Sequence, residues 1–383
     1  MALLTGRTPT RVGVEFNVND GRTQAMPTDV PTLAERFRAA GFATGLIGKW
    51  HLGHSEGRRP TERGFDEFFG FHGSLAHYDP RKRHKRANLL RGMEPENPAG
   101  WLTPAFATEA GQFIERHAAN PFFLCVSFNA VHQPIEPDPA QFDAVRSIKG
   151  RQRARYMNLV AGLDDAVAEI ERALQRTQLL ERTLVVFVSD NGAWDEASNG
   201  GLRGGKFDLH EGGLRVPLLM RWPGRIAAGA VESRPVMTVD VAATLLAAAG
   251  IAPDPSAAID GIDLLPFLGR AAGAAPRDLL CWRFGTQYAV RDGPLKLVVH
   301  DVTSAPELFD VVADPAESRD LAAAEPDAVA RLRQRYAEWD AGNVPPLWER
   351  PAQDRSRPEW EEGDPVTEEP PGAGDGEWRD AER

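Results

Sequence analysis

Polar side chains that could carry out chemistry follow an apolar run at three places in the chain. Leu184 to Val188 ends in Ser189-Asp-Asn-Gly192, Phe42 to Ile47 ends in Gly48-Lys-Trp-His-Leu-Gly53, and Phe122 to Phe128 ends in Asn129-Ala-Val-His132. Each run has the composition of a buried strand of a parallel sheet. Open α/β sheets bind ligands beyond the carboxyl ends of such strands. The three ends are therefore the candidate functional positions.

The first cluster offers oxygen ligands. Asp190 and Asn191 place a carboxylate and an amide side by side, which suits Ca²⁺ or Mg²⁺ better than a softer metal. Six glycines follow by Gly213, so the loop can bring backbone and Lys206 close to a ligand. Lys206 would supply a compact positive charge beside an anion. An ordinary Asp-Asn-Gly turn explains Asp190, Asn191 and Gly192 equally well.

The other two clusters offer nitrogen groups. Lys49 and His51 are two residues apart, so in an extended chain both point to one face. A lysine and a histidine on a loop are usually only solvated, and a lone histidine such as His132 is more often structural than catalytic. The sequence predicts function here only if the three clusters act together.

Composition limits the class of protein. The chain of 383 residues is long enough for one large core and a smaller domain, and its 42% hydrophobic content is that of a globular protein. The net charge is −11, but residues 351–383 carry 11 acidic and 4 basic side chains, which leaves only about −4 for the rest. We therefore predict no nucleic-acid partner. The basic run Arg81 to Arg86 is a solvated loop or a rim that attracts an anionic substrate.

The cysteines and the amino terminus exclude two further features. Cys125 lies in an apolar run and Cys281 beside Trp282. Two cysteines give no disulfide framework, and a single disulfide stays open. The first residues contain neither a signal peptide nor a membrane span. Periplasmic, secreted and cytoplasmic locations all stay open, as does the oligomeric state.

The order of elements predicts an α/β fold, a mostly parallel sheet with helices on both faces. Strands alternate with helices up to about residue 270, and the longest helix spans Arg151 to Arg176. Thr32-Leu-Ala-Glu35 has the spacing of a capping box at a helix start, and the aromatic-rich stretch from Arg63 to Phe71 is predicted to be a loop. After a small-residue linker, four short strands and a helix over Asp327 to Trp339 predict a small antiparallel subdomain. The predicted domains are 1–270, 271–350 and an acidic, disordered tail over 351–383.

Taken together, these clusters resemble the type I sulfatases of the alkaline-phosphatase-like superfamily. The resemblance runs from Ala2 to about Trp339 and rests on collinear segments, each weak alone. They include Leu3-Leu-Thr-Gly-Arg7, Gly48-Lys-Trp-His-Leu-Gly53, Arg63-Gly-Phe-Asp66, His132-Gln-Pro134, Ser189-Asp-Asn-Gly192, Gly204-Gly-Lys206 and Glu211-Gly-Gly-Leu-Arg-Val-Pro217.

The resemblance implies hydrolysis of a carbohydrate or aryl sulfate ester at a formylglycine made from a cysteine, with one divalent cation, usually Ca²⁺. It assigns Asp190 and Asn191 to the metal. It assigns Lys49, His132 and Lys206 to the sulfate and the leaving oxygen, and His51 to proton transfer that releases sulfate.

One part of the family pattern is missing. The family's C-x-P-S-R segment stands immediately before its L-L-T-G-R, where this chain begins with Met1. Cys125 is followed by Val-Ser-Phe and Cys281 by Trp-Arg-Phe, so neither cysteine can substitute. We expect the nucleophile, its arginine, two metal-binding aspartates and the first core strand to be absent.

Three interpretations remain open. The chain is an amino-terminally truncated sulfatase, a short protein that binds sulfated or other anionic ligands without turnover, or a related phosphoesterase. The sulfatase segments argue against the third. An in-frame C-x-P-S-R or S-x-P-S-R upstream of Met1 would favour the first interpretation, and a stop codon there the second.

Overall fold

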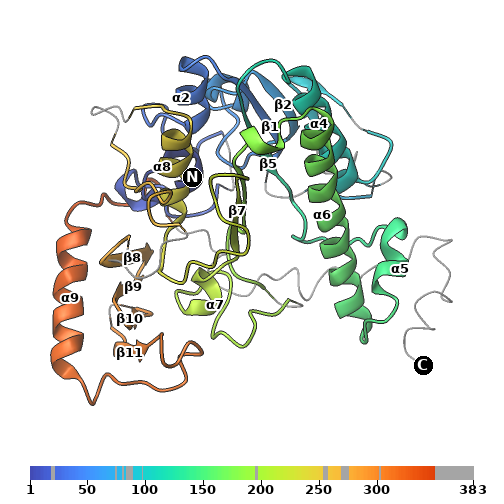
Figure 1. The fold of residues 1–383 in the computed structure, drawn as a ribbon. Helices are drawn as coiled ribbons and strands as arrows, with labels where there is room; N and C mark the ends of the chain where they lie inside the picture. Colours follow the sequence, from blue (N-terminus) through green and yellow to red (C-terminus); the bar gives the residue numbers. More distant parts are fainter. Residues whose placement is uncertain are drawn as a thin grey trace. The chain divides into compact units, whose positions relative to one another are not determined.

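The computed structural model describes residues 1–18, 22–73, 76–79, 82, 89–96, 98–194, 197–252, 258–268, 276–301 and 303–349. They fall into two compact units. Unit 1 comprises Met1–Asn17 and Leu184–Arg350, and unit 2 contains Val18–Thr183. Each unit is described by itself (Figure 1).

Unit 2 is built on a five-stranded sheet in the order β4-β3-β2-β1-β5. Its strands are β1 (Ala43–Lys49), β2 (Glu67–Phe71), β3 (Leu90–Arg91), β4 (Glu94–Pro95) and β5 (Phe122–Ser127). Its helices are α2 (Leu33–Ala39), α4 (Leu102–Arg116), α5 (Phe142–Val145) and α6 (Arg151–Arg176), with short 3₁₀ turns at Pro60–Arg63, Pro139–Gln141 and Leu180–Arg182. The core strands β2, β1 and β5 run parallel, as predicted, whereas β3 and β4 add antiparallel pairs.

Glycines allow the three parallel strands to come together at their carboxyl ends. Gly48 of β1 lies opposite Gly70 of β2 and Ser127 of β5. A Cβ on Gly70 would lie 1.9 Å from the Gly48 carbonyl oxygen, and one on Gly48 would lie 2.0 Å from that of Ser127. Gly48 also has φ 109°, a conformation that side chains disfavour. A larger residue at either position would push the strand ends apart.

Helices cover both faces of this sheet, as the sequence predicts. On one face, the Phe37 ring of α2 stacks on Phe123 of β5 with centroids 4.5 Å apart. On the other, Phe113 of α4 packs edge-on against Phe122, which points the opposite way along the same strand. The long helix α6 lies alongside α4 (Figure 1). Burial of these rings on both faces holds the strand ends in a fixed frame.

Two sequence expectations for unit 2 can be compared directly. Thr32 and Glu35 form the predicted capping box, because the Thr32 hydroxyl accepts from the Glu35 amide at 3.0 Å and the Glu35 carboxylate accepts from the Thr32 amide at 2.8 Å. The aromatic-rich stretch up to Phe71, predicted as a loop, instead contains β2. Parallel pairing with β1 buries Phe68, Phe69 and Phe71, and that tertiary burial decides the conformation.

Unit 1 contains two small sheets and several helices. Its first sheet pairs β6 (Val185–Val188) with β7 (Leu218–Arg221). The second contains β8 (Leu279–Phe284), β9 (Gln287–Asp292), β10 (Leu295–Val299) and β11 (Glu307–Asp310). Its helices are α1 (Ala2–Thr5), α7 (Glu211–Leu214), α8 (Thr238–Ala248) and α9 (Pro326–Asp340), with a 3₁₀ turn at Pro9–Arg11.

The pairing of β6 differs from the sequence prediction. We expected this apolar run to be buried on both faces of a parallel sheet, but β6 pairs antiparallel with β7. Its residues are mostly half-buried, and 36% of Phe187 is exposed. Among the described residues of unit 1, only β7 pairs with β6, so its apolar side chains are incompletely covered.

The second sheet confirms the predicted antiparallel subdomain. Its order is β11-β10-β9-β8, with every neighbouring pair antiparallel. Helix α9 lies alongside it (Figure 1), and Leu332 packs into a core with Val290, Leu297 and Leu308. We call this sheet, β8 to β11, the C-terminal sheet.

A buried ion triad joins the C-terminal sheet to the start of α7. Lys296 on β10 is fully buried, and its Nζ lies 2.9 Å from Glu211 Oε1 and 3.0 Å from Glu317 Oε1. The Glu211 amide also donates to Glu317 Oε2 at 2.7 Å. These contacts hold the segment Glu211-Gly-Gly-Leu214 against the sheet.

The division into units does not follow the predicted domain boundary at residue 270, because α7 and the loop before it are held to the C-terminal sheet. The boundary itself stays a prediction. Most of the predicted linker, the basic run Arg81 to Arg86 apart from Lys82, and the predicted disordered tail lie outside the described residues. No helix in the described part of the chain is long and apolar enough to cross a membrane.

The Lys296 triad yields a stability prediction. Lys296→Met should lower the free energy of unfolding by about 3–5 kcal/mol, because it leaves two carboxylates without their cation. Urea unfolding at neutral pH measures the loss. Adding Glu317→Gln should recover part of it by removing one unpaired charge. The exposed Lys149→Met is the matched control, and equal stability of the two methionine variants would contradict the prediction.

Candidate functional site

In unit 2, Lys49, His51 and His132 lie at one edge of the sheet. Lys49 is the last residue of β1, and His51 follows two residues later. His132 follows the adjacent parallel strand β5, which ends at Ser127. The carboxyl ends of neighbouring parallel strands meet at the same sheet edge. The structure therefore gathers three of the predicted residues at the edge where the sequence places a ligand.

His51 is held in a specific backbone conformation. Its φ is 53°, which is uncommon for a residue other than glycine, and its amide donates to the His72 carbonyl at 3.0 Å. Its Nε2 lies 2.9 Å from the Val18 carbonyl oxygen. A carbonyl only accepts, so Nε2 carries a proton in this contact. The other ring nitrogen, Nδ1, is then the atom that could take up a proton.

His132 lies on a turn that a buried tyrosine organises. The Tyr78 hydroxyl lies 2.8 Å from the Asn129 carbonyl oxygen and 2.7 Å from that of His132. The backbone amides of Tyr78 and Asp79 donate to Glu136 Oε2. Burial, with the nearby Glu136 charge, raises the pKa of Tyr78 well above its ordinary value, so the phenol stays a donor. The turn that presents His132 is thus tied at both ends to one buried segment.

In unit 1, Asp190 and Asn191 follow β6 directly. Asp190 is exposed, and the Asn191 side-chain amide donates to the Gly192 carbonyl at 2.8 Å. The Ser189 hydroxyl donates to the Asn191 carbonyl at 3.0 Å. The donor half of the Asn191 amide is used within the turn, so its side-chain oxygen is the atom that could bind a cation. A carboxylate and an amide oxygen on adjacent residues fit a hard cation.

Lys206 belongs to the loop that packs on this turn. Its amide donates to the Ala193 carbonyl at 3.2 Å, and the Gly192 amide donates to the Gly213 carbonyl at 3.1 Å. A Cβ on Gly192 would lie 1.7 Å from the Gly212 oxygen, so the close approach requires glycine there. The Lys206 ammonium lies 5.4 Å from the Phe207 ring centroid. The glycine loop therefore holds the Lys206 backbone against Ala193, two residues after Asn191.

The six predicted site residues thus form two groups. Lys49, His51 and His132 share the sheet edge of unit 2, and Asp190, Asn191 and Lys206 share one packed loop of unit 1. Convergence of both groups on one ligand stays a prediction.

A further histidine at the unit 2 edge escaped the sequence analysis. His72 directly follows β2, which neighbours β1, and its ring stacks with Phe68 and His54. Its Nε2 is buried and has no hydrogen-bond partner among the described residues. Burial, helped by His54 and Arg59, lowers the pKa of His72 to about 4. A neutral imidazole therefore lies at the edge that holds Lys49 and His51.

Of the two residues that the sequence analysis missed, His72 and Tyr78, only His72 had a signal in the sequence. His72 stood out only once Glu67–Phe71 was identified as a strand, because the residue after a parallel strand lies at the ligand edge. Tyr78 gave no signal, since its role depends on carbonyls 51 and 54 positions away.

The whole chain can be compared with known proteins. The sulfatase family model matches residues 1–251, and a model described as N-sulphoglucosamine sulphohydrolase, C-terminal, matches residues 205–338. N-acetylgalactosamine-6-sulfatase from Canis lupus familiaris is 35% identical over 326 residues, 77% of this chain and 60% of that protein. The human enzyme of that name is 34% identical and covers 70% of this chain and 55% of the relative. This chain spans little more than half the length of these relatives.

Arylsulfatase A from Homo sapiens is also 34% identical, over 88% of this chain and 72% of the relative. Among solved structures, the crystal structure of Ps i-CgsB has a TM-score of 0.86 at 27% identity, covering 92% of this chain and 84% of that one. The same protein in complex with k-i-k-neocarrahexaose gives a TM-score of 0.84.

His72 makes the stability of the protein depend on pH. Its pKa is lowered in the folded state and near 6.5 in the unfolded state, so the unfolded chain binds more protons between those values. Stability should therefore fall as pH decreases from about 6.5 towards 4. His72→Phe keeps a stacking ring without the proton, so its urea midpoint should fall less over this range. Parallel pH profiles for the two proteins would show that His72 does not contribute.

Proposed function

We propose that this chain, which belongs to the sulfatase family, serves in the hydrolysis of sulfate esters of carbohydrates. The observation that carries the proposal is the adjacent parallel pairing of β1 and β5, which puts Lys49, His51 and His132 at one sheet edge. The relatives favour a carbohydrate, since one set is named for N-acetylgalactosamine-6-sulfate and a similar structure holds a neocarrahexaose. An aryl sulfate remains the second substrate class, through the likeness to arylsulfatase A.

The cationic side chains would bind and polarise the sulfate group. Lys49 and Lys206 supply compact positive charges, which stabilise charge that develops on the sulfuryl oxygens. His132, with Lys206, would hold a proton near the leaving oxygen, which must be protonated as its bond to sulfur breaks. His51, through its Nδ1, would take a proton when sulfate is released. Each role needs only a side chain that the sequence provides at a strand end.

Asp190 and Asn191 would hold the cation that the family uses, Ca²⁺ or Mg²⁺. The exposed carboxylate and the side-chain oxygen of Asn191 fit a hard ion. When bound, such an ion neutralises charge on the sulfate oxygens.

The two cysteines do not fit a formylglycine. Cys125 lies within β5, and Cys281 is buried in the core of the C-terminal sheet. Desolvation raises the pKa of the Cys125 thiol to about 11 and that of Cys281 to about 12. Neither lies in a C-x-P-S-R segment. We therefore assign no attacking group among residues 1–383.

This mismatch favours a second candidate function. With charge-binding groups but no fitting cysteine, residues 1–383 could bind a sulfated carbohydrate without cleaving it. Measured turnover of a sulfate ester distinguishes hydrolysis from binding without cleavage.

The activity test compares two forms of the protein, each co-expressed with a formylglycine-generating enzyme. Residues 1–383 should show little or no turnover of an aryl sulfate or a sulfated monosaccharide, because charge stabilisers without a nucleophile keep only a small part of the rate. The reading frame extended upstream of Met1 should be active, and Lys206→Ala or His132→Ala should lower its kcat by roughly 10²–10³-fold.

Lys149→Ala, an exposed lysine of unit 2, is the matched control and should leave kcat unchanged. Comparable turnover by the short form would show that one of residues 1–383 performs the attack. The proposed function would be overturned if the extended form is inactive and its Lys206→Ala variant binds the sulfated sugar as tightly as the unsubstituted extended form does.

A further inference from the structure

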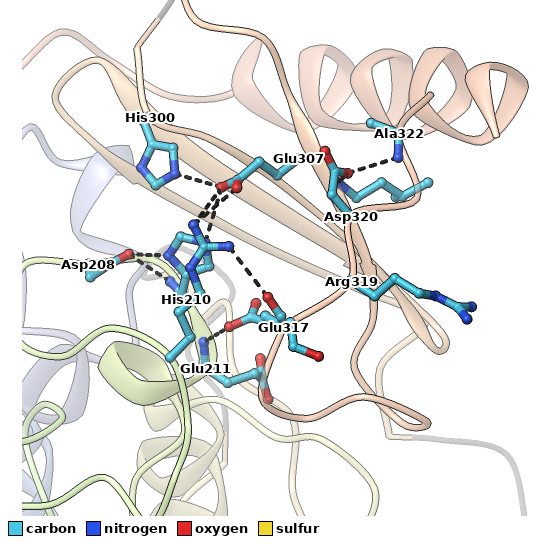
Figure 2. A network of polar contacts seen from close by, with 12 residues as sticks. Asp208, His210, Glu211, His300, Glu307, Glu317, Arg319, Asp320 and Ala322 are labelled. Atoms are coloured by element: carbon cyan, nitrogen blue, oxygen red, sulfur yellow. Dashed lines mark hydrogen bonds and ion pairs between the residues drawn. The ribbon is translucent and has the colours of Figure 1, made fainter. Parts of the chain in front are cut away.

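Two histidines and a glutamate converge in unit 1, away from the residues assigned above. His210, just before α7, His300, just after β10, and Glu307, at the start of β11, each offer one ligand atom, and these atoms lie within 4.8 Å of one another. Figure 2 shows both imidazoles turned towards the Glu307 carboxylate. His210 Nε2 lies 3.3 Å from Glu307 Oε2, and His300 Nε2 lies 2.8 Å from the same oxygen.

The proton positions at His210 expose an unsatisfied contact. Its Nδ1 lies 2.7 Å from Asp208 Oδ1, so the proton of a neutral ring belongs on that nitrogen. The Nε2 lone pair then faces Glu307 Oε2, which is also an acceptor. Two acceptors 3.3 Å apart need a second proton or a cation between them.

We propose that His210, His300 and Glu307 bind a zinc ion, and that Asp208 orients His210 from behind. Three nitrogen and oxygen ligands with one position left for water match a common zinc site. Ligands at zinc's bond lengths lie about 3.3 Å apart in a tetrahedron, which is the His210–Glu307 separation. The His300–Glu307 separation of 2.8 Å is about half an ångström shorter than this, and the ligand atoms of His210 and His300 lie within 4.8 Å of each other.

The surroundings of the cluster favour zinc over a buried extra proton. The His210 side chain is only 1% exposed, so a doubly protonated ring would carry a charge with little solvation. Its contact with Asp208 is the carboxylate–histidine arrangement that orients metal-bound imidazoles. His300 is 40% exposed, which gives an ion a path from solvent.

One neighbouring charge opposes a cation. Arg203 Nη2 lies 3.0 Å from Glu307 Oε1 and 3.3 Å from Oε2, so the guanidinium already neutralises part of this carboxylate. The shorter contact falls on Oε1, and the Arg203 guanidinium also lies over the Phe309 ring. Oε2 is the oxygen that faces both imidazoles. Arg203 therefore orients Glu307 while weakening the affinity for zinc.

The site has a structural consequence. His210 comes four residues after Lys206 on the same glycine loop, whereas His300 and Glu307 belong to the C-terminal sheet. A bound zinc ion would join this loop to the sheet beside the Lys296 triad. It should therefore stabilise unit 1 against unfolding by mass action.

The test uses residues 1–383 without a histidine tag, stripped with a chelator and then kept in excess Ca²⁺ so that hard oxygen sites are filled. Titration with zinc chloride against a competing chromophoric chelator should show one bound equivalent, and zinc should raise the melting temperature. His300→Ala and Glu307→Gln should each weaken binding at least tenfold and abolish the thermal shift. Asp208→Asn should weaken it by about 10–100-fold.

His117→Ala is the matched control, because His117 pairs with a carboxylate, Glu67, in unit 2 and belongs to no cluster of three metal-ligating side chains among the described residues. It should leave zinc binding unchanged. Two results would overturn the proposal. One is zinc binding by the parent protein that neither His300→Ala nor Glu307→Gln reduces. The other is a parent protein that binds no more zinc than these variants do. Because the His300 side chain is 40% exposed, its alanine variant should still unfold cooperatively, and a cooperative transition shows that the loss of binding is not a loss of folding.

Discussion

The close approach of β2, β1 and β5 at their carboxyl ends is the constraint on which the unit 2 site depends. Gly48 and Gly70 permit it, since a Cβ on either would overlap a backbone carbonyl. Lys49 ends β1, and His51, His72 and His132 follow the ends of β1, β2 and β5, so the backbone packing of these strands sets where the four residues begin. Open α/β sheets bind ligands at this edge.

In unit 1, glycines again permit close packing of the backbone, and a buried ion triad adds a second constraint. Glycines at 192, 212 and 213 let the Lys206 loop pack on the turn of Asp190 and Asn191, and the Lys296 triad anchors the next segment to the C-terminal sheet. Breaking the triad would leave charges buried without partners, which is far costlier than losing a surface ion pair. The loop that carries Lys206 is thereby fixed at both of its ends.

The sequence predicted those features that local pattern controls. The apolar spacing of α6 gave its bounds, Arg151 and Arg176, and collinear motifs gave the sulfatase family, which the comparisons confirm. The sequence analysis failed where contacts between residues far apart in the chain decide the structure. The stretch of β2 is aromatic and not alternating, so only pairing with β1 identifies it as a strand. The antiparallel pairing of β6 with β7 and the meeting of His210 with His300 and Glu307 likewise depend on residues far apart in the chain.

The central claim is that the two groups of predicted residues serve one ligand. The most direct measurement is a crystal structure of residues 1–383 grown with Ca²⁺ and a sulfated monosaccharide. The account predicts Asp190 and Asn191 side-chain oxygens about 2.3–2.6 Å from the ion. It also predicts Lys49, His132 and Lys206 within hydrogen-bond distance of the sulfate oxygens or of the ester oxygen. A sulfated sugar bound elsewhere, with His132 and Lys206 facing different regions of solvent, would contradict it.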